Sequence, residues 1–138
     1  VAADNSRFGL PEVKRGIFAG AGGVFRLPRA LPRNIALEIV ATGDPLPAER
    51  LYQLGLVNRM VASEKVLDEA KSLAAQIGVN APLAVRKSLE VARQAYDGTE
   101  SDLWKASNEA SAIVFSSEDA KEGPRAFLER RDAVWKGR

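Results

Sequence analysis

Most of this 138-residue sequence places its apolar residues at helical spacing, and only one run alternates as a strand does. The strand-like run is Leu56 to Val61, whereas Val66, Ala70, Leu73 and Ile77 recur along one face of a helix. A parallel α/β core needs several strands, and these are almost absent. We therefore expect a mostly helical chain with one or two short strands, and we expect the rest of its domain to lie upstream of Val1.

Glycine, proline and capping residues set the expected ends of the helices. A helix over about 20–28 should end at Pro28 or at the Leu31-Pro32 step. Gly43 should stop a helix over 34–42, and Gly55 should stop one over 48–54. The later helices are expected to begin at Ser63, Asn80, Thr99 and Ser117. Pro124 should kink or restart the last of them.

The absence of cysteine and histidine restricts the chemistry more than any other feature of the composition. Without cysteine there can be no disulfide, thiolate metal site or cysteine nucleophile. Without histidine the chain can hold no Ser-His-Asp triad, no histidine general base and no histidine metal ligand. Any acid–base step must therefore use carboxylates, lysine or tyrosine, and we expect no metal.

The charges are nearly balanced, with 20 basic and 18 acidic residues and a net charge of +2. The basic residues are scattered apart from a cluster near the C-terminus, whereas nucleic-acid binders concentrate them on one face. No stretch approaches the roughly 18 apolar residues of a membrane span. We expect a cytoplasmic protein that binds neither nucleic acid nor membrane.

One segment combines a carboxylate with closely spaced glycines. Arg7-Phe8-Gly9-Leu10-Pro11-Glu12 is followed by Gly16 and then by Gly20-Ala21-Gly22-Gly23. Pro11 holds the preceding residue in an extended or turn geometry, so that Glu12 comes directly after a turn. Glycines at the start of a helix permit close backbone approach and leave N–H groups free. The glycine spacing does not match a dinucleotide-binding fingerprint.

This pattern resembles that of the crotonase superfamily of enoyl-CoA hydratases and isomerases. The resemblance continues in the same order through Ala41-Thr42-Gly43, Ala48, Gly55-Leu56-Val57-Asn58, Glu118-Asp119, Glu122-Gly123-Pro124 and Ala126-Phe127. The run 122–138 is especially similar to that of carnitinyl-CoA dehydratase-like members. The resemblance covers essentially the whole chain and implies the C-terminal part of the α/β crotonase fold, a ClpP-like spiral. It implies that residues 1–60 complete the spiral core and that 61–138 form a helical region for trimerisation and covering of CoA.

The resemblance also implies a chemistry. Members bind an acyl-CoA thioester and stabilise an enolate with two backbone N–H groups. Hydratases use two glutamates, and Glu12 matches the one that exchanges a proton with C2 of the substrate. The other glutamate and both N–H groups belong to a stretch upstream of Val1, so this chain alone should be inactive. No cofactor is implied, because coenzyme A is part of the substrate.

Further residues match positions near the substrate. Gly20 could bring its N–H group to the reacting water or acyl chain, although tight helix packing is the simpler explanation for this glycine. Ile17, Phe18 and Phe25 could line the acyl pocket or could belong to an ordinary core. Departures from the common family pattern at Ala19 and Val24-Phe25 leave the acyl group open.

The C-terminal helix carries two candidate CoA contacts. The resemblance implies that Phe127 lies against the adenine and that Arg130 meets a phosphate, which its planar guanidinium suits. The alternative is a solvated basic tail with one core aromatic residue.

Three functions remain open. The leading one is reversible hydration of a 2-enoyl-CoA by the complete protein. An enoyl-CoA isomerase would use Glu12 alone, and a non-catalytic module would retain only the oligomer surface. If Glu12 stood without its motif, a solvated surface carboxylate would be the better interpretation. The expected partners are an acyl-CoA thioester, the N-terminal half of the same enzyme, and further copies in a homo-trimer or hexamer.

Overall fold

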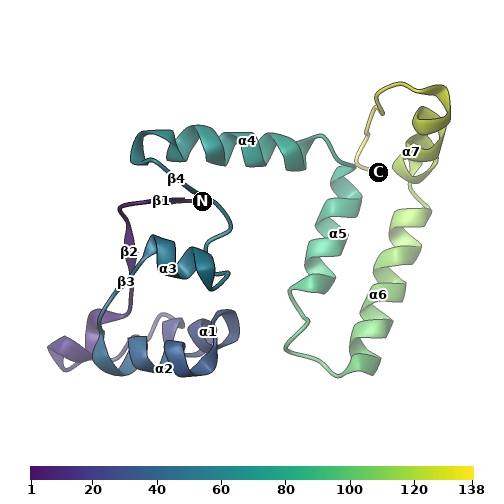
Figure 1. The fold of residues 1–138 in the computed structure, drawn as a ribbon. Coiled ribbons are helices and arrows are strands. Elements are labelled where there is room, and N and C mark those ends of the chain that lie inside the picture. The colour runs from purple at the N-terminus through teal and green to yellow at the C-terminus, as the bar shows by residue number, and fades with distance from the viewer. The chain divides into compact units, whose positions relative to one another are not determined.

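The computed structural model describes all residues from 1 to 138 and divides them into two compact units. Unit 1 is Val1–Ser72 and unit 2 is Leu73–Arg138. Seven α-helices carry most of the chain, and the four strands have two residues each (Figure 1). The expectation of a mostly helical chain with few short strands is confirmed. The predicted division of roles between 1–60 and 61–138 stays a prediction.

The strands of unit 1 form two separate pairs. β1 (Ala2–Ala3) pairs in parallel with β4 (Met60–Val61), and β2 (Arg7–Phe8) pairs antiparallel with β3 (Leu46–Pro47). The strand expected over 56–61 is therefore shorter than predicted, because only its last two residues have a partner. The antiparallel pair matters for the site, because it fixes the chain directly before Gly9.

Two short 3₁₀ helices and four α-helices make up the rest of unit 1. They are η1 (Pro11–Arg15), α1 (Gly23–Ala30), α2 (Arg33–Thr42), α3 (Ala48–Gln53), η2 (Ser63–Lys65) and α4 (Val66–Gly78), which continues into unit 2. α1 begins later than expected and runs through Pro28, ending before Leu31, whose extended φ of −131° suits a residue before proline. Gly43 ends α2 in the left-handed conformation, as predicted.

The core of unit 1 lies among α1, α2 and α3. Leu31, Ala36, Ile39 and Leu51 are its buried members, and Leu51 is 1% exposed. Six partly buried residues pack around them: Leu27, Ile35, Leu46, Leu54, Leu56 and Val57. η1 packs against α2. The element that carries Glu12 therefore rests on a helix anchored in this core.

In unit 2, α5 (Pro82–Ala92) packs against α6 (Glu100–Phe115), and α7 (Glu118–Glu129) follows. The predicted starts at Thr99 and Ser117 are confirmed. Thr99 exchanges side-chain and backbone hydrogen bonds with Asp102 in a capping box, and the Ser117 hydroxyl accepts from the Ala120 N–H at 3.1 Å. α7 continues through Pro124 without a restart.

Two predicted N-caps are wrong, although η2 begins at Ser63 and α5 begins at Pro82, close to the predicted helix starts. The Asn80 side chain donates to the Gln76 carbonyl at 2.9 Å, so it closes α4 and does not begin α5. Ser63 caps no helix, because its hydroxyl donates to the Asn5 side chain at 2.8 Å. An N-cap side chain accepts from a backbone N–H in the first turn of the helix that follows it. In both cases here the side chain bonds to another group instead.

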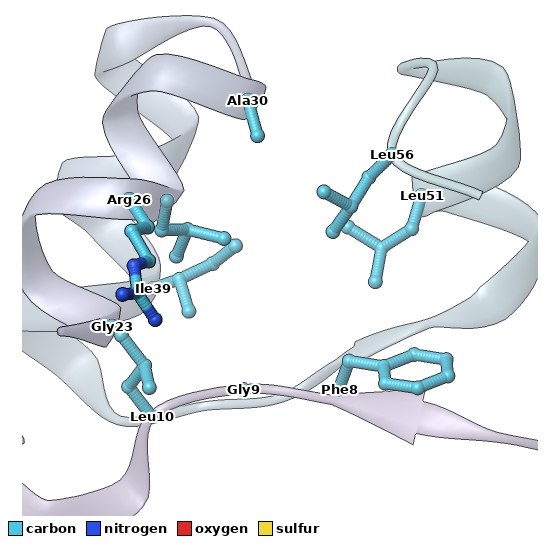
Figure 2. A pocket seen from close by; sticks show the side chains of 10 residues that line it. Phe8, Gly9, Leu10, Gly23, Arg26, Ala30, Ile39, Leu51 and Leu56 are labelled. Carbon is cyan, nitrogen blue, oxygen red and sulfur yellow. The ribbon is translucent and has the colours of Figure 1, made fainter. Parts of the chain in front are cut away.

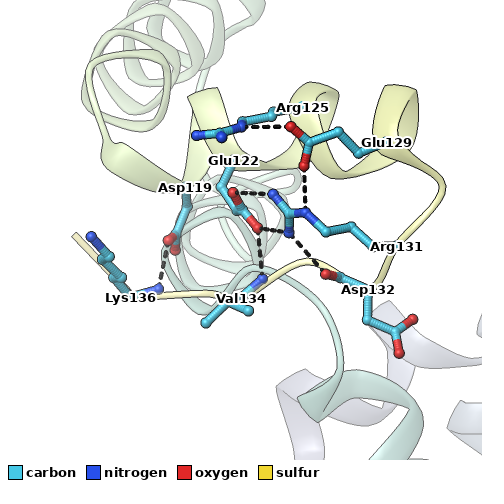
Figure 3. A network of polar contacts seen from close by, with 8 residues as sticks. All are labelled: Asp119, Glu122, Arg125, Glu129, Arg131, Asp132, Val134 and Lys136. Atoms are coloured by element: carbon cyan, nitrogen blue, oxygen red, sulfur yellow. Dashed lines mark hydrogen bonds and ion pairs between the residues drawn. The ribbon is translucent and has the colours of Figure 1, made fainter.

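Carboxylates of α7 hold the C-terminal segment (Figure 3). Asp119 is 4% exposed, and its two oxygens accept the backbone N–H groups of Lys136 at 2.7 Å and Gly137 at 2.9 Å. The Trp135 indole N–H donates to the Val79 carbonyl at 2.7 Å. A segment with little apolar burial is thus held by hydrogen bonds to the buried Asp119 carboxylate and to the exposed Val79 backbone.

Candidate active site

Glu12 has an unusual carboxyl group. It lies in the first turn of η1 and is half-buried, and its Oε2 atom is fully buried with no hydrogen-bond partner. Buried carboxyl oxygens are nearly always bonded, so an orphan needs an explanation. The surface-carboxylate interpretation does not fit this atom. A carboxyl oxygen kept from water and from protein donors is suited to meet a group that arrives from outside the chain.

Backbone bonds fix the turn that bears this carboxyl. Pro11 stands at the start of η1, where its missing N–H costs nothing. The N–H of Gly16 donates to the Val13 carbonyl at 3.3 Å, and that of Ile17 donates to the Glu12 carbonyl at 3.2 Å. Gly16 has a φ of 67°, which glycine adopts without strain. The Glu12 backbone is therefore part of a closed turn.

The segment with Glu12 touches the start of the glycine-rich helix. A Cβ built on Gly23 would lie 2.6 Å from Leu10 Cδ2, so these two residues are in close contact. Gly22, at the N-cap of α1, has a φ of 93°. The Gly20 N–H donates within its own loop to the Phe18 carbonyl at 2.8 Å. Tight packing is thus found at Gly23, whereas Gly20 is exposed.

Three apolar residues predicted for the acyl pocket lie on the surface of this chain. Ile17, Phe18 and Phe25 are 60%, 74% and 54% exposed. The ordinary-core interpretation is therefore wrong for these side chains within this chain. The Arg26 guanidinium lies 5.6 Å from the Phe25 ring centroid, a cation–π distance.

Unit 1 also contains an apolar hollow of about 240 Å³. Figure 2 shows Phe8, Gly9 and Leu10 along one edge, with Leu51 and Leu56 facing Ala30 across the hollow. Its full lining is Phe8, Gly9, Leu10, Gly23, Arg26, Leu27, Ala30, Ile39, Leu51 and Leu56. Glu12 is not among these residues, so the hollow and the carboxyl are separate features.

The two predicted CoA contacts belong to the end of α7 in unit 2. Phe127 is 83% exposed, which excludes the alternative of a core aromatic residue. Arg130 ends α7 with a φ of 54°, and it is the only non-glycine residue with positive φ. An arginine in this conformation is less favourable than glycine would be, which is compatible with a use for its side chain.

Acidic and basic side chains alternate along α7 and the C-terminal segment. Hydrogen bonds from Arg131 and from the Val134 N–H lower the pKa of Glu122 to about 2. The pKa of Glu118 is lowered by its hydrogen bond from Lys136 at 2.6 Å, and that of Glu129 by Arg125 and Arg131. These carboxylates stay ionised through the physiological range, as a structural network requires.

The structure contains no group of three or more acidic, histidine or cysteine side chains that could hold a metal ion. None of its helices combines the length and apolar content needed to cross a membrane.

Sequence reasoning missed the polar anchor of the C-terminal segment. In the sequence Asp119 stands out only as part of a family motif, yet its two backbone contacts lie 17 and 18 residues further along the chain. No local pattern predicts a contact at that separation. The family-like motif Glu118-Asp119 is the only sequence feature that singles out Asp119.

A family model described as enoyl-CoA hydratase/isomerase matches residues 1–138 of the chain. The chain belongs to this family. Carnitinyl-CoA dehydratases of Shigella flexneri and Escherichia coli K12 are each 44% identical over 146 residues, covering 100% of this chain and 54% of the relative. The chain thus spans about half the length of the curated relatives it matches.

Solved structures of the family confirm the fold. An enoyl-CoA hydratase from Mycobacterium tuberculosis H37Rv matches with a TM-score of 0.95 and 44% identity over 99% of this chain and 54% of that one. One from Mycobacterium marinum matches with a TM-score of 0.95 and 41% identity, with the same coverage. The chain therefore has the predicted C-terminal part of the crotonase fold.

Proposed function

We propose that this chain is the C-terminal half of an enoyl-CoA hydratase, in which Glu12 gives a proton to C2 of the acyl thioester and takes it back. The observation that carries the proposal is the buried, unpartnered Oε2 of Glu12. A carboxyl in this state has an oxygen free for a substrate proton. The family and the similar dehydratases support the reaction class.

The reaction uses the carboxyl as a general acid and base. In hydration, water adds at C3 and a proton is added at C2; in dehydration the same carboxyl removes the C2 proton as the C3 hydroxyl leaves. Acidity at C2 depends on stabilising the thioester enolate. The donors for that oxygen, and the second glutamate, are proposed to come from an upstream half, so the 138-residue chain by itself should show no turnover.

The side chains that are proposed to contact the substrate are exposed. Ile17, Phe18 and Phe25 would contact the acyl group, beside the backbone of Gly20. Phe127 and Arg130 would contact the adenine and a phosphate of coenzyme A. Their exposure in this chain supports the proposal, because apolar side chains this open are suited to being covered by a ligand or another chain. No metal or separate cofactor takes part.

The proposed partners are the upstream half of the same enzyme and further copies in a trimer or hexamer, in the cytoplasm. The relatives' greater length supports the first. Exposed apolar side chains of the helices, such as Trp104 at 62% and Phe115 at 77%, support the second. Light scattering of the full-length polypeptide, in which the upstream half precedes Val1, measures the oligomer directly.

The test compares Glu12→Gln with wild type in the full-length polypeptide. Because a glutamine cannot exchange the proton, kcat for hydration of crotonyl-CoA should fall by about 10²–10⁴-fold while KM changes little. Glu38→Gln, an exposed carboxylate of α2, is the matched control and should leave both constants near wild type. Unchanged kcat in Glu12→Gln would exclude the proposed role.

The family also includes isomerases, which is the specific ground for a second candidate function. An isomerase would use Glu12 alone to move a proton between carbons of a 3-enoyl-CoA. Supplying 2-enoyl and 3-enoyl thioesters in parallel separates the two functions. Turnover of the 3-enoyl substrate without hydration would favour the isomerase, and binding of neither would favour a non-catalytic oligomerisation module.

A further inference from the structure

The loop between α2 and β3 lies against the segment that carries Glu12. The loop is Gly43-Asp44-Pro45, called here the 43–45 turn. It contacts this segment both before and after Glu12, although it is about 30 positions further along the chain. Nothing in the proposed chemistry uses this turn, and of its three residues only Gly43 belongs to a family-like motif, Ala41-Thr42-Gly43.

Gly43 makes the contact with η1, mainly with the residues that follow Glu12. A Cβ built at this position would lie 3.1 Å from Val13 Cγ2, 3.1 Å from Lys14 Cγ and 3.3 Å from the Cα of Pro11. Gly43 also has a φ of 66°. Only glycine combines this conformation with so close an approach. η1 therefore rests directly on the backbone of the turn.

Pro45 makes the contact on the N-terminal side. A Cβ built on Gly9 would lie 2.8 Å from the Pro45 Cα, so the two backbones meet with no side chain between them. The Arg7 guanidinium donates to the Pro45 carbonyl at 2.7 Å, and β2 pairs with β3 immediately beyond. The chain entering η1 is thus held against the same turn as η1 itself.

The turn is fixed in its own place. The Thr42 hydroxyl donates to the Glu38 carbonyl at 2.8 Å and accepts from the Asp44 N–H at 3.1 Å, which ties the turn to the end of α2. Lys14 and Asp44 form an ion pair, but their side chains are 48% and 69% exposed. Such a pair contributes little in water, so the backbone contacts of Gly43 and Pro45 dominate.

We infer that the 43–45 turn positions the Glu12 carboxyl, with Gly43 as the residue that sets how close η1 can lie to α2. The inference rests on the proposed role of Glu12. Gly43 touches no substrate and acts only through Pro11, Val13 and Lys14. A side chain at Gly43 makes its neighbours in η1 give by a few tenths of an ångström, and because a misplacement of about 1 Å can slow a reaction by about 10²-fold, a shift of half that size slows it about tenfold.

The test is Gly43→Ala in the full-length polypeptide, with Gly55→Ala as the matched control. Gly55 has a φ of 82°, so alanine is strained at both positions, but a Cβ at Gly55 meets nothing within 4 Å. The strain is common to the two variants, and only Gly43→Ala displaces η1. We expect kcat for crotonyl-CoA hydration to fall at least tenfold further in Gly43→Ala than in Gly55→Ala, with the two KM values within twofold.

A second measurement follows η1 itself in the full-length polypeptide. The N–H groups of Gly16 and Ile17, which close the turn onto Val13 and Glu12, should exchange with deuterium at least tenfold faster in Gly43→Ala than in Gly55→Ala. Equal kcat values in the two variants would overturn the inference, as would equal exchange rates. If Glu12→Gln keeps full activity, the proposed function itself fails; if it is inactive while the two glycine variants match, only the positioning role fails.

Discussion

Unit 1 is stabilised internally by one kind of contact and unit 2 by another. Of the eight buried apolar residues, seven lie in unit 1 and only Ala126 lies in unit 2. Unit 2 instead buries two polar residues, Ser117 and Asp119, and surrounds them with ion pairs. Apolar burial fixes the helices of unit 1 against which the turn bearing Glu12 packs, whereas hydrogen bonds to carboxylates fix the C-terminal segment.

The difference shows what each unit has to do. A reacting carboxyl must be held to within a fraction of an ångström, which close packing on a rigid core provides. The C-terminal segment has few apolar residues to bury, so its backbone needs hydrogen-bond partners instead. The two units should therefore respond differently to loss of apolar volume, to loss of an acceptor and to acid.

The largest effect is expected from Leu51→Ala in unit 1. Leu51 is 1% exposed and already borders the apolar hollow, so truncation leaves its neighbours without packing partners. We expect the free energy of unfolding to fall by about 2–5 kcal/mol. Chemical denaturation measures it. Leu67→Ala, at a side chain 63% exposed, is the control and should change it by less than about 0.5 kcal/mol.

In unit 2 the corresponding test is Asp119→Asn. Its amide has a single acceptor oxygen, so one of the N–H groups of Lys136 and Gly137 is left facing a donor. The free energy of unfolding should fall by about 1–3 kcal/mol. Asp132→Asn, at an exposed position in the same segment, should have no measurable effect. If the two asparagine variants are equally stable, the buried carboxylate does not anchor the segment.

Acid should loosen unit 2 before it affects the core of unit 1. The pKa of Glu122 is about 2 when Arg131 and Val134 donate to it, below its ordinary value near 4.5. A lowered pKa stabilises the folded state when the pH is above the ordinary pKa of the group. This stabilisation is lost as the pH falls from about 4.5 to about 2. Trp135 fluorescence should report release over that range, because its indole bonds to Val79. Glu122→Gln should remove the part of this pH dependence that Glu122 contributes and leave the smaller part from Glu118 and Glu129, whose pKa values are also lowered, and Glu109→Gln should retain all of it.

The smallest effect is expected from Lys14→Met in unit 1. The ion pair with Asp44 is 48% and 69% exposed, so its loss should cost less than about 1 kcal/mol and leave kcat within a factor of two. A larger fall in kcat would show that charge, and not the glycine contact at residue 43, holds η1 in place.

Local signals in the sequence predicted much of the fold. Gly43 ends a helix because it adopts φ of 66°, and Thr99 and Ser117 begin helices because their hydroxyls accept N–H groups of the first turn. The family motif around Glu12 identified the carboxyl that the structure leaves without a partner. Each of these features depends on residues within a few positions of one another.

Long-range contacts account for what the sequence did not predict. The Asn80 side chain bonds back to α4 and the Ser63 hydroxyl bonds to Asn5, so neither side chain caps the start of a helix. The approach of Gly9 to Pro45 joins residues 36 positions apart, and only the folded chain reveals it. The sequence likewise does not predict that Phe18 is exposed, because large apolar residues usually lie in a core.

The most direct test of the central claim is proton exchange at C2. The full-length polypeptide is incubated in D₂O with a saturated acyl-CoA, which cannot be hydrated, and deuterium at C2 is followed by NMR or mass spectrometry. We predict that wild type exchanges the C2 proton and that Glu12→Gln does so at least about 10²-fold more slowly. Equal exchange rates in the two proteins would contradict the assignment of Glu12 as the group that moves this proton.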